Sequence, residues 1–238
     1  MLNHNFAFYV SVDECVLDVF NANKSLKDIA RKYPFFLLAS NLQAKQIKNS
    51  ERFNFIFNEN SFSKKMISLL HHIKGMNISA KYWIRLDADT LVLKKNELLS
   101  MVQKNIPFNE NIYAGVYSTR VSGHFLEIYD MMGLSFTKDQ YIRGGCSVLT
   151  YTSMMKLLNH LDTIKPSLLD REYDYFINCI CDKLGMTFME LSTFEINDEY
   201  TGESPTWHPL KIDELSRADQ IIHQQKKYYE DTKPTDKG

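Results

Sequence analysis

The chain has 238 residues, of which 44% are hydrophobic and 24% are charged, as in an ordinary globular protein. These values exclude a disordered chain, and nine Gly with six Pro exclude a collagen-like one. The 28 Lys and Arg nearly balance the 29 Asp and Glu, so the chain lacks the basic excess that is typical of nucleic-acid-binding proteins.

Seven short apolar runs, rich in aromatic and β-branched residues, predict strands. The runs lie at residues 6–12, 35–39, 53–57, 81–86, 111–118, 146–150 and 187–191. Apolar residues between these runs recur at helical spacing, and the chain closes with a polar helix. The helices are expected near residues 16–20, 26–30, 66–73, 152–161, 172–184 and 212–230.

This alternation predicts an α/β fold with a mostly parallel central sheet flanked by helices. We expect a single domain over residues 1–230 and a disordered, charged tail over residues 231–238. In such folds, ligands bind beside the carboxyl ends of the strands. The positions of interest therefore follow the strands directly: Asp13, Ser40, Asn58, residues 87–90 and the loop around Gly144.

The N-terminus and the cysteines indicate the compartment. MLNHNFAFYV lacks the basic region and long apolar core of a signal peptide, and no apolar stretch reaches the ~20 residues of a membrane span. We expect a cytoplasmic protein, or a soluble fragment of a larger one. The cysteines have no zinc-site spacing and have apolar neighbours, which indicates four buried thiols: Cys15, Cys146, Cys179 and Cys181.

Other recurrent motifs are missing or have ordinary explanations. There is no GxGxxG and no GxxxxGK[ST], so the sequence indicates neither classical dinucleotide binding nor a P-loop. On the helix near residues 66–73, His71 and His72 lie close to Lys64, Lys65 and Lys74. We expect this polar helix face to be solvated.

Asp87 and Asp89 directly follow the apolar strand KYWIRL. Residues i and i+2 of an extended segment point to the same side, so the two carboxylates would repel each other without a cation nearby. Carboxylate oxygens suit Mg²⁺ or Mn²⁺, which one or two carboxylates and substrate phosphates commonly hold. We therefore expect a divalent metal beside a diphosphate. The alternative is an Asx-turn whose carboxylates cap backbone N–H groups.

Four segments together resemble glycosyltransferases with the GT-A fold, a Rossmann-like α/β domain. KYWIRLDADTLVL resembles their metal-binding segment, and TWHPLK resembles a late histidine that ligates the metal in several of these families. QYIRGGCSVLTYTSMMKLL and DREYDYFINCICDKLG resemble the Gly-Gly strand and the acidic segment of Fringe-like β-1,3-glycosyltransferases. The matches follow the family's order between residues 81 and 211. Ala88 departs from the third acid that Fringe-like enzymes often carry, and LDADTLV equally resembles retaining GT-A families.

The resemblance implies that Asp87, Asp89 and His208 hold Mn²⁺ or Mg²⁺ and that the donor is a nucleoside diphosphate-sugar, with UDP favoured. Asp87 would contact either the metal or the donor ribose. The candidate donor-binding residues are Ser11, Asp13, Arg85, Ala88, Arg143, Gly144, Gly145 and Lys211. Simpler explanations stay open for several of them: a surface histidine at 208, a helix N-cap at 13, a surface ion pair at 143, a plain turn at 144–145 and a solvated lysine at 211.

Inverting sugar transfer needs a base within about 3 Å of the acceptor hydroxyl. We expect Asp174 to be this base, with Asp170 and Glu172 as the other candidates. Alternatively, the three acids form the first turn of a helix, where the helix dipole favours negative charge.

The leading hypothesis is a metal-dependent, inverting glycosyltransferase that acts on a glycan or another hydroxyl acceptor, for example in the assembly of a surface polysaccharide or a glycoprotein glycan. One alternative is a retaining GT-A glycosyltransferase. A second is a sugar-phosphate nucleotidyltransferase, which would be expected to carry a Gly-rich basic loop where this chain has SVDECVLDVF. A third is a non-catalytic binding module, against which Asp87, Asp89 and His208 together argue. The sequence specifies no sugar, acceptor or oligomeric state, and it indicates neither a nucleic-acid partner nor a membrane span.

Overall fold

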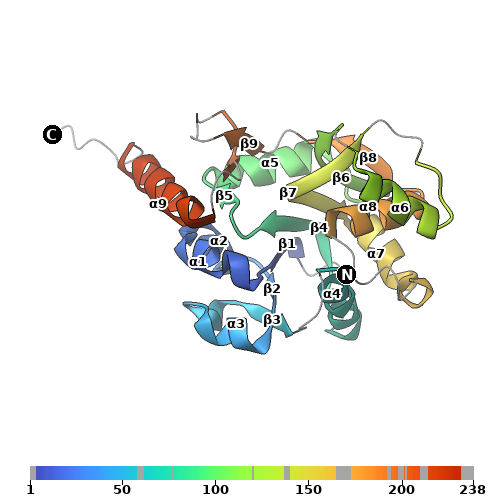
Figure 1. Ribbon diagram of the computed structural model, residues 1–238, viewed down its shortest axis with the longest axis horizontal. Coiled ribbons are helices and arrows are strands. Elements are labelled where there is room, and N and C mark those ends of the chain that lie inside the picture. Colours follow the sequence, from blue (N-terminus) through green and yellow to red (C-terminus); the bar gives the residue numbers. More distant parts are fainter. Residues whose placement is uncertain are drawn as a thin grey trace.

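A seven-stranded sheet forms the centre of the molecule (Figure 1). The computed structural model describes residues 4–57, 62–76, 78–119, 121–136, 140–164, 173–191, 194–197, 201, 203–209 and 214–231. In spatial order the strands are β3 (Asn54–Phe57), β2 (Phe35–Ala39), β1 (His4–Ser11), β4 (Ala80–Asp87), β7 (Tyr141–Thr150), β6 (Ile112–Ser118) and β8 (Thr187–Glu190). Only β7 runs antiparallel to its neighbours, β4 and β6. The expected mostly parallel α/β sheet is confirmed.

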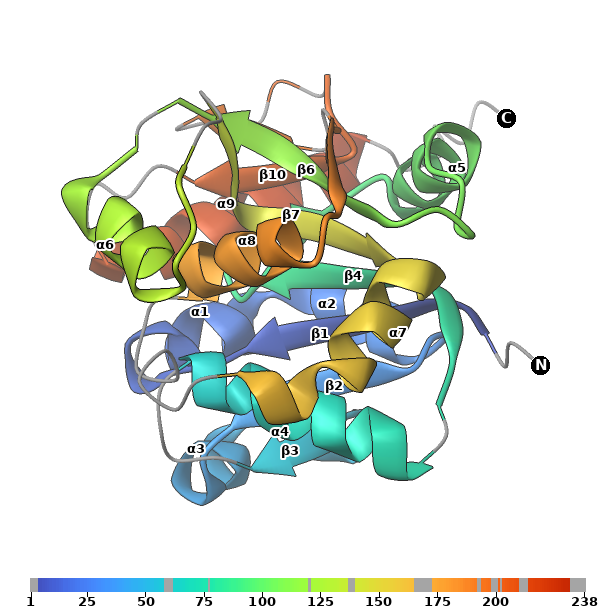
Figure 2. The same ribbon diagram turned by 90° about the vertical axis from the view of Figure 1, so that its right-hand side faces the viewer.

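Helices cover both faces of this sheet (Figure 2). The face that we call the α4 face is covered by α4 (Phe62–Met76), α6 (Gly123–Met131), α7 (Tyr151–Asn159) and α8 (Tyr173–Lys183). The opposite α2 face is covered by α1 (Leu17–Ala22), α2 (Lys24–Ala30) and α5 (Lys95–Asn105). The helices α3 (Asn41–Gln46) and α9 (Glu214–Asp231) and three short 3₁₀ turns (Glu14–Val16, Ser50–Arg52 and Leu161–Thr163) complete the described helical segments.

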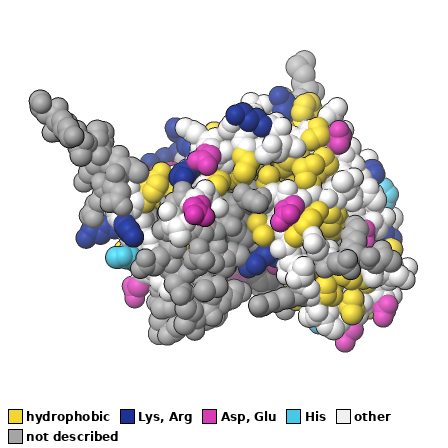
Figure 3. All heavy atoms as spheres, turned by 90° about the horizontal axis from the view of Figure 1, so that it is seen from above, with side chains coloured by type: hydrophobic (Ala, Val, Ile, Leu, Met, Phe, Trp, Pro, Cys, Tyr) yellow, Lys and Arg dark blue, Asp and Glu magenta, His cyan; other side chains and the backbone are white. Residues whose placement is uncertain are grey.

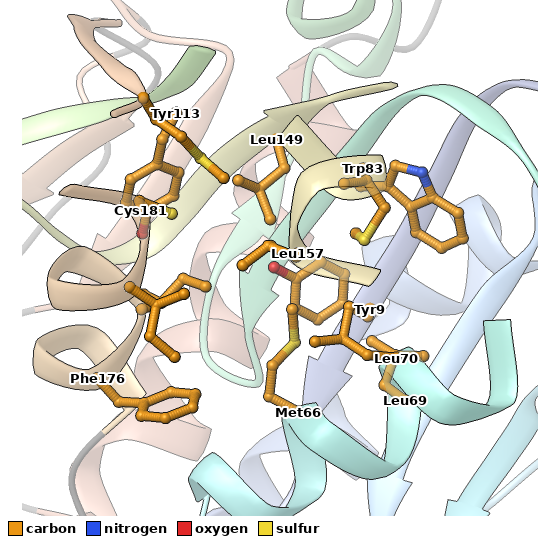
Figure 4. Close-up of a cluster of buried hydrophobic side chains, with 14 of the residues drawn as sticks. Tyr9, Met66, Leu69, Leu70, Trp83, Tyr113, Leu149, Leu157, Phe176 and Cys181 are labelled. Atoms are coloured by element: carbon orange, nitrogen blue, oxygen red, sulfur yellow. The ribbon is translucent and has the colours of Figure 1, made fainter. Parts of the chain in front are cut away.

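Each strand feeds two cores because its side chains alternate between the faces. On β4, Tyr82 and Ile84 are buried on the α2 face, whereas Trp83 is buried on the α4 face. Figure 4 shows the core of the α4 face, where Met66 and Leu69 of α4 lie near Tyr9 of β1. Burying each such large side chain stabilises the fold by roughly 1.5–3 kcal/mol.

A separate three-stranded sheet lies beside the carboxyl end of β4. Its order is β5 (Leu91–Val92), β10 (Thr206–Pro209), β9 (Phe194–Asn197). Strand β10 runs antiparallel to β5 and parallel to β9. The fully buried Trp207 of β10 packs in a small apolar cluster with Leu91, Val19 of α1 and Ile221 of α9. This cluster ties the C-terminal part of the chain to the segment that follows Asp89.

Several local expectations need correction. Cys15 is exposed, unlike the other three cysteines, because it lies in a single 3₁₀ turn after β1 that buries little surface. Lys65 is buried rather than solvated, because its aliphatic stem crosses the apolar interior and its ammonium group reaches Asp13. The strand expected at residues 146–150 begins earlier, at Tyr141, because the glycine pair is accommodated within it.

Three helices were not expected from the sequence: α3, α5 and α6. Helix α3 has no buried residue and starts with a capping box, in which Ser40 and Gln43 satisfy each other's backbone N–H groups. Apolar periodicity therefore gives no signal for it.

None of the described helices has both the length and the apolar composition needed to cross a bilayer. On the face seen in Figure 3, acidic and basic side chains are interspersed with hydrophobic ones. The expected tail at 231–238 starts within α9, and residues 232–238 lie outside the described part of the chain, so the single domain and the disordered tail stay predictions.

Candidate active site

On the α4 face, the side chains of β4 change from apolar to charged toward the carboxyl end of the strand. Trp83 is a core residue, and the next two side chains on that face belong to Arg85 and Asp87. Asp87 is the last residue of the strand, and its carbonyl accepts a hydrogen bond from the Thr90 N–H at 3.0 Å. This turn brings Asp89 into a buried position directly beyond the strand. We refer to residues 87–90 as the DxD loop.

Neutral hydrogen bonds from α2 and its N-terminal junction hold the DxD loop. The buried Asn23 amide Nδ2 donates to the carbonyls of Ala88 at 3.1 Å and Thr90 at 2.9 Å. Ser25 Oγ donates to Asn23 Oδ1 at 2.7 Å and accepts from the Val92 N–H at 3.0 Å. Both side chains are almost completely buried, so this chain of bonds fixes the loop without adding charge.

The small sheet brings His208 to the DxD loop. Pairing of β10 with β5 sets Thr206 opposite Val92 and Trp207 opposite Leu91, which directs the chain toward Asp89. His208 Nε2 lies 3.1 Å from Asp89 Oδ1 and 3.8 Å from Asp87 Oδ2. One ligand atom from each of the three residues lies within 4.8 Å of the other two. The sequence prediction that these residues share one site is therefore supported by their geometry.

The donor set of this group fits a divalent cation. The two carboxylates offer the oxygen ligands that Mg²⁺ and Mn²⁺ take, and the imidazole adds a nitrogen ligand of the kind that transition metals accept. Burial raises the pKa of the Asp87 carboxyl, the nearby Asp174 and Asp89 raise it further, and Arg85 and His208 oppose that rise. The carboxylates of Asp87 and Asp89 thus lie close together, and a cation between them would relieve their mutual repulsion.

On the other side of the loop, an arginine bridges two carboxylates. Arg85 Nη2 lies 2.6 Å from Asp87 Oδ1, and Arg85 Nη1 forms an ion pair with Asp174 Oδ1. The arginine side chain is only 8% exposed, whereas that of Asp174 is 31% exposed. Asp174 therefore has one oxygen held by the protein and part of its carboxylate open to solvent.

The position of Asp174 is set by a contact between α8 and β7. Asn178 Nδ2 donates to the Asp174 carbonyl at 2.6 Å and to the Ile142 carbonyl at 2.7 Å. The Ile142 N–H returns a bond to Asn178 Oδ1 at 2.9 Å. This fully buried amide links the first turn of α8 to β7, so the acid at the helix start is placed beside the end of β4.

The end of β1 adds a second acid to this edge of the sheet. Asp13 follows the strand and forms an ion pair with the buried Lys65 of α4, whose ammonium group also lies 3.4 Å from the Val12 carbonyl. Ser11 pairs in register with Asp87, and its buried Oγ has no hydrogen-bond partner among the described residues. A ligand hydroxyl or phosphate at this edge could satisfy that group.

The glycine pair of β7 lies next to the DxD loop. Gly145 has φ of 103°, a conformation that residues with a side chain rarely adopt, and its carbonyl accepts a bond from Thr90 Oγ1 at 3.0 Å. Gly144 precedes it in β7, and Arg143 is half-buried in the same strand. The positive φ thus explains why a glycine stands at position 145.

Three predicted site residues lie outside the described part of the chain: Asp170, Glu172 and Lys211. Four positioning residues were missed by sequence reasoning: Asn23, Ser25, Lys65 and Asn178. No sequence motif marks them, because each acts through a partner in another element.

Comparison with known proteins shows which solved structures have a similar fold. No protein-family model matches the sequence, and no curated protein matches it. The apo structure of the bifunctional glycosyltransferase WbbM is similar, with a TM-score of 0.55 at 13% identity, over 97% of this chain and 52% of that one. This chain therefore spans about half of that larger protein.

Two further solved structures match over nearly their whole length. A glycosyltransferase involved in glycosylation of the major capsid of PBCV-1 gives a TM-score of 0.54 at 10% identity, over 92% of this chain and 99% of that one. A 4-diphosphocytidyl-2C-methyl-D-erythritol synthase gives 0.54 at 9% identity, over 94% and 100%. The chain has a GT-A-like fold. Since identities this low establish the fold alone, its activity has to be argued from the site.

Proposed function

We propose that the protein is a metal-dependent glycosyltransferase that moves a sugar from a nucleoside diphosphate-sugar to a hydroxyl group of a glycan acceptor. The observation that carries the proposal is the convergence of Asp87, Asp89 and His208 at the carboxyl edge of the sheet, with their ligand atoms within 4.8 Å of one another. Ligands of open α/β sheets bind at this edge. The glycosyltransferases among the similar folds support the same activity.

In this proposal Asp89 and His208 hold Mn²⁺ or Mg²⁺, and Asp87 binds the ion or the donor ribose. The bound ion supplies a Lewis acid for the negative charge of the departing nucleoside diphosphate. Ser11 and Asp13, at the end of β1, contact the nucleotide. UDP is the proposed nucleotide.

The donor sugar is proposed to lie against β7, where Gly144 and Gly145 allow a close approach of the backbone. Arg85 and Ala88 belong to the same edge, although their described contacts are to Asp87, Asp174 and Asn23. Arg143 and Lys211 remain proposed phosphate or acceptor contacts.

Asp174 is proposed as the base that accepts the proton of the acceptor hydroxyl. Its carboxylate is partly exposed, and the ion pair with Arg85 fixes its orientation. A carboxylate that is oriented but open on one side suits an incoming hydroxyl group. Asp170 and Glu172 are the other candidates. A direct displacement with this base inverts the anomeric centre, and a retaining enzyme is the alternative.

A nucleotidyltransferase is the second candidate, favoured by the likeness to the 4-diphosphocytidyl-2C-methyl-D-erythritol synthase fold. Such an enzyme would be expected to bind a nucleoside triphosphate with a Gly-rich basic loop after the first strand. Here that position carries Ser11, Asp13 and Cys15, and the nearby Lys65 is already paired with Asp13. The local chemistry therefore favours a nucleoside diphosphate-sugar over a triphosphate.

The two candidates release different products, which gives the test. The chain would be incubated with Mn²⁺ and a panel of nucleoside diphosphate-sugars, and in parallel with nucleoside triphosphates and sugar 1-phosphates. Release of a nucleoside diphosphate from the first panel is expected. Release of pyrophosphate from the second panel alone would replace the glycosyltransferase with the nucleotidyltransferase. Absence of turnover and of thermal stabilisation by every donor would contradict both.

A further inference from the structure

A second hollow lies apart from the Asp87–Asp89–His208 group. It has a volume of about 370 Å³ and is lined by α2, the connection from β5 to α5, and the last turns of α9. This volume falls within the range of small-molecule sites. None of its lining residues belongs to the proposed donor or base positions. We call it the α2–α9 pocket.

The pocket gathers three lysines: Lys32, Lys94 and Lys95. Two acids also line it, but each already has a basic partner: Asp28 pairs with Arg31 at 2.9 Å and Glu97 pairs with Lys94 at 3.8 Å. Within the described part of the chain, neither Lys32 nor Lys95 has a carboxylate within 4.0 Å. Two ammonium groups thus face the pocket without a direct ion pair, and Asp28 acts on Lys95 only from beyond that distance.

These two lysines also act on each other. Burial lowers the pKa of the Lys95 ammonium, the nearby Lys32 lowers it further, and the charge of Asp28 opposes this without cancelling it. Placing like charges together and partly removing one from water is unfavourable unless an anion binds between them. The N-terminus of the 11-residue helix α5, which begins at Lys95, adds a positive potential at the same place.

The pocket wall is aromatic on its α9 side. Tyr228 and Tyr229 line it, and Tyr229 is 43% exposed. Lysines bind phosphate as compact point charges, and a tyrosine ring offers a flat apolar surface to an attached group such as a sugar. A carboxylate brings a single negative charge, whereas a phosphate monoester brings about two at neutral pH and can neutralise both ammonium groups.

We propose that the α2–α9 pocket binds a phosphate ester through Lys32 and Lys95, with the rest of the ligand against Tyr228 and Tyr229. In the chain, the short strand β5 connects the DxD loop to residues that line the pocket. Ser25 and Val92, which line it, also belong to the hydrogen-bond chain that holds that loop. The phosphate can belong to a soluble sugar phosphate or to a lipid headgroup. The proposal does not depend on the glycosyltransferase activity.

The test uses the full chain in EDTA, so that no divalent ion draws phosphate to the DxD loop. Inorganic phosphate and glucose 1-phosphate would be titrated by calorimetry, and sedimentation would measure binding to vesicles with and without phosphatidate. The Lys32→Gln/Lys95→Gln double variant is expected to bind at least about tenfold more weakly. The control is Lys104→Gln, which removes one positive charge from the exposed end of α5 and should bind like the wild type.

Binding of the soluble phosphates that the double variant loses supports the site, with a soluble ester as its ligand. Phosphatidate-dependent vesicle binding that the double variant loses supports it with a lipid headgroup. The proposal is overturned if the wild type binds neither, or if the double variant binds them like the wild type while showing an unchanged melting temperature. Donor binding with Mn²⁺ should be the same in both proteins, which separates this result from a failure of the proposed activity.

Discussion

The two sides of the DxD loop are held by different kinds of interaction. On the α2 face, Asn23 and Ser25 hold the loop with neutral hydrogen bonds that are closed off from solvent. On the α4 face, Arg85 ties Asp87 to Asp174 with charge, and both carboxylates are partly exposed. Buried neutral networks fix geometry, whereas charged and partly solvated groups change their interactions when a ligand brings its own charge. The difference suggests that one side serves as a scaffold and the other performs chemistry.

The largest effect is expected from the charged side. Asp174→Asn should lower the transfer rate by about 10²–10⁴-fold, because an amide cannot take the proton from the hydroxyl group of the acceptor substrate. Donor affinity should stay within about twofold, since Asp174 is not part of the metal group. Rates and donor affinities would be measured separately. A variant with wild-type turnover would move the base to another acid.

The next largest effect is expected at Asp89, in the DxD loop between the two sides. Asp89→Ala should weaken Mn²⁺-dependent donor binding by more than about 100-fold, since loss of a ligand exceeds the loss of an outer partner. Calorimetric titration of UDP with and without Mn²⁺ checks this. Binding that stays metal-dependent at wild-type affinity would remove Asp89 from the metal site.

The neutral side can be broken at Asn23. Asn23→Ala leaves the buried carbonyls of Ala88 and Thr90 without their donor, which should lower the free energy of unfolding by at least about 2 kcal/mol. Mn²⁺ affinity should fall about 10–100-fold, because the loop that carries the ligands loses its support.

The matched control for this variant is Asn21→Ala. Asn21 lies in α1, two residues before Asn23, and its side chain bonds to the backbone of Gln46 and Lys48, away from the loop. Metal affinity should then be unchanged. Equal losses of metal affinity in both variants would show that general destabilisation, not loop support, explains the Asn23 result.

The smallest effect is expected from Arg85→Lys, a substitution that keeps the positive charge but loses the planar shape of the guanidinium group. Arg85→Lys retains the positive charge but cannot hold two carboxylates in one plane, so turnover should fall about fivefold. Metal affinity should change little because Asp87, Asp89 and His208 all remain. Comparing the loss of turnover with the loss of metal affinity shows whether Arg85 orients Asp174 or supports the metal group. A large loss of metal affinity would instead assign Arg85 to the scaffold.

Local patterns were sufficient for one part of the site. The strand that ends in Asp87, the second acid at Asp89 and the glycine at 145 are all readable from neighbouring residues. Strand alternation places two acids at one sheet edge, and turn geometry restricts the residue at a positive φ. The α/β fold follows from the same kind of information, because apolar periodicity reports which faces are buried.

Contacts between distant segments decided the rest. His208 could be connected to the metal site only through family resemblance, and the pairing of β10 with β5 is what brings it to Asp89. Lys65 was expected in solvent, and Asp13 accounts for its burial. Cys15 was expected in the core, and a single exposed turn accounts for its exposure.

The sequence by itself determined the α/β architecture, the strand-end carboxylates and the absence of nucleotide-binding glycine motifs. Only the tertiary structure decided that Asn23 holds the DxD loop, that Arg85 orients Asp174 and that Lys32 and Lys95 share one pocket. The reason is physical. Periodicity and turn preferences act over a few residues, whereas each of these contacts joins elements whose separation in the chain is bridged only when the core has packed.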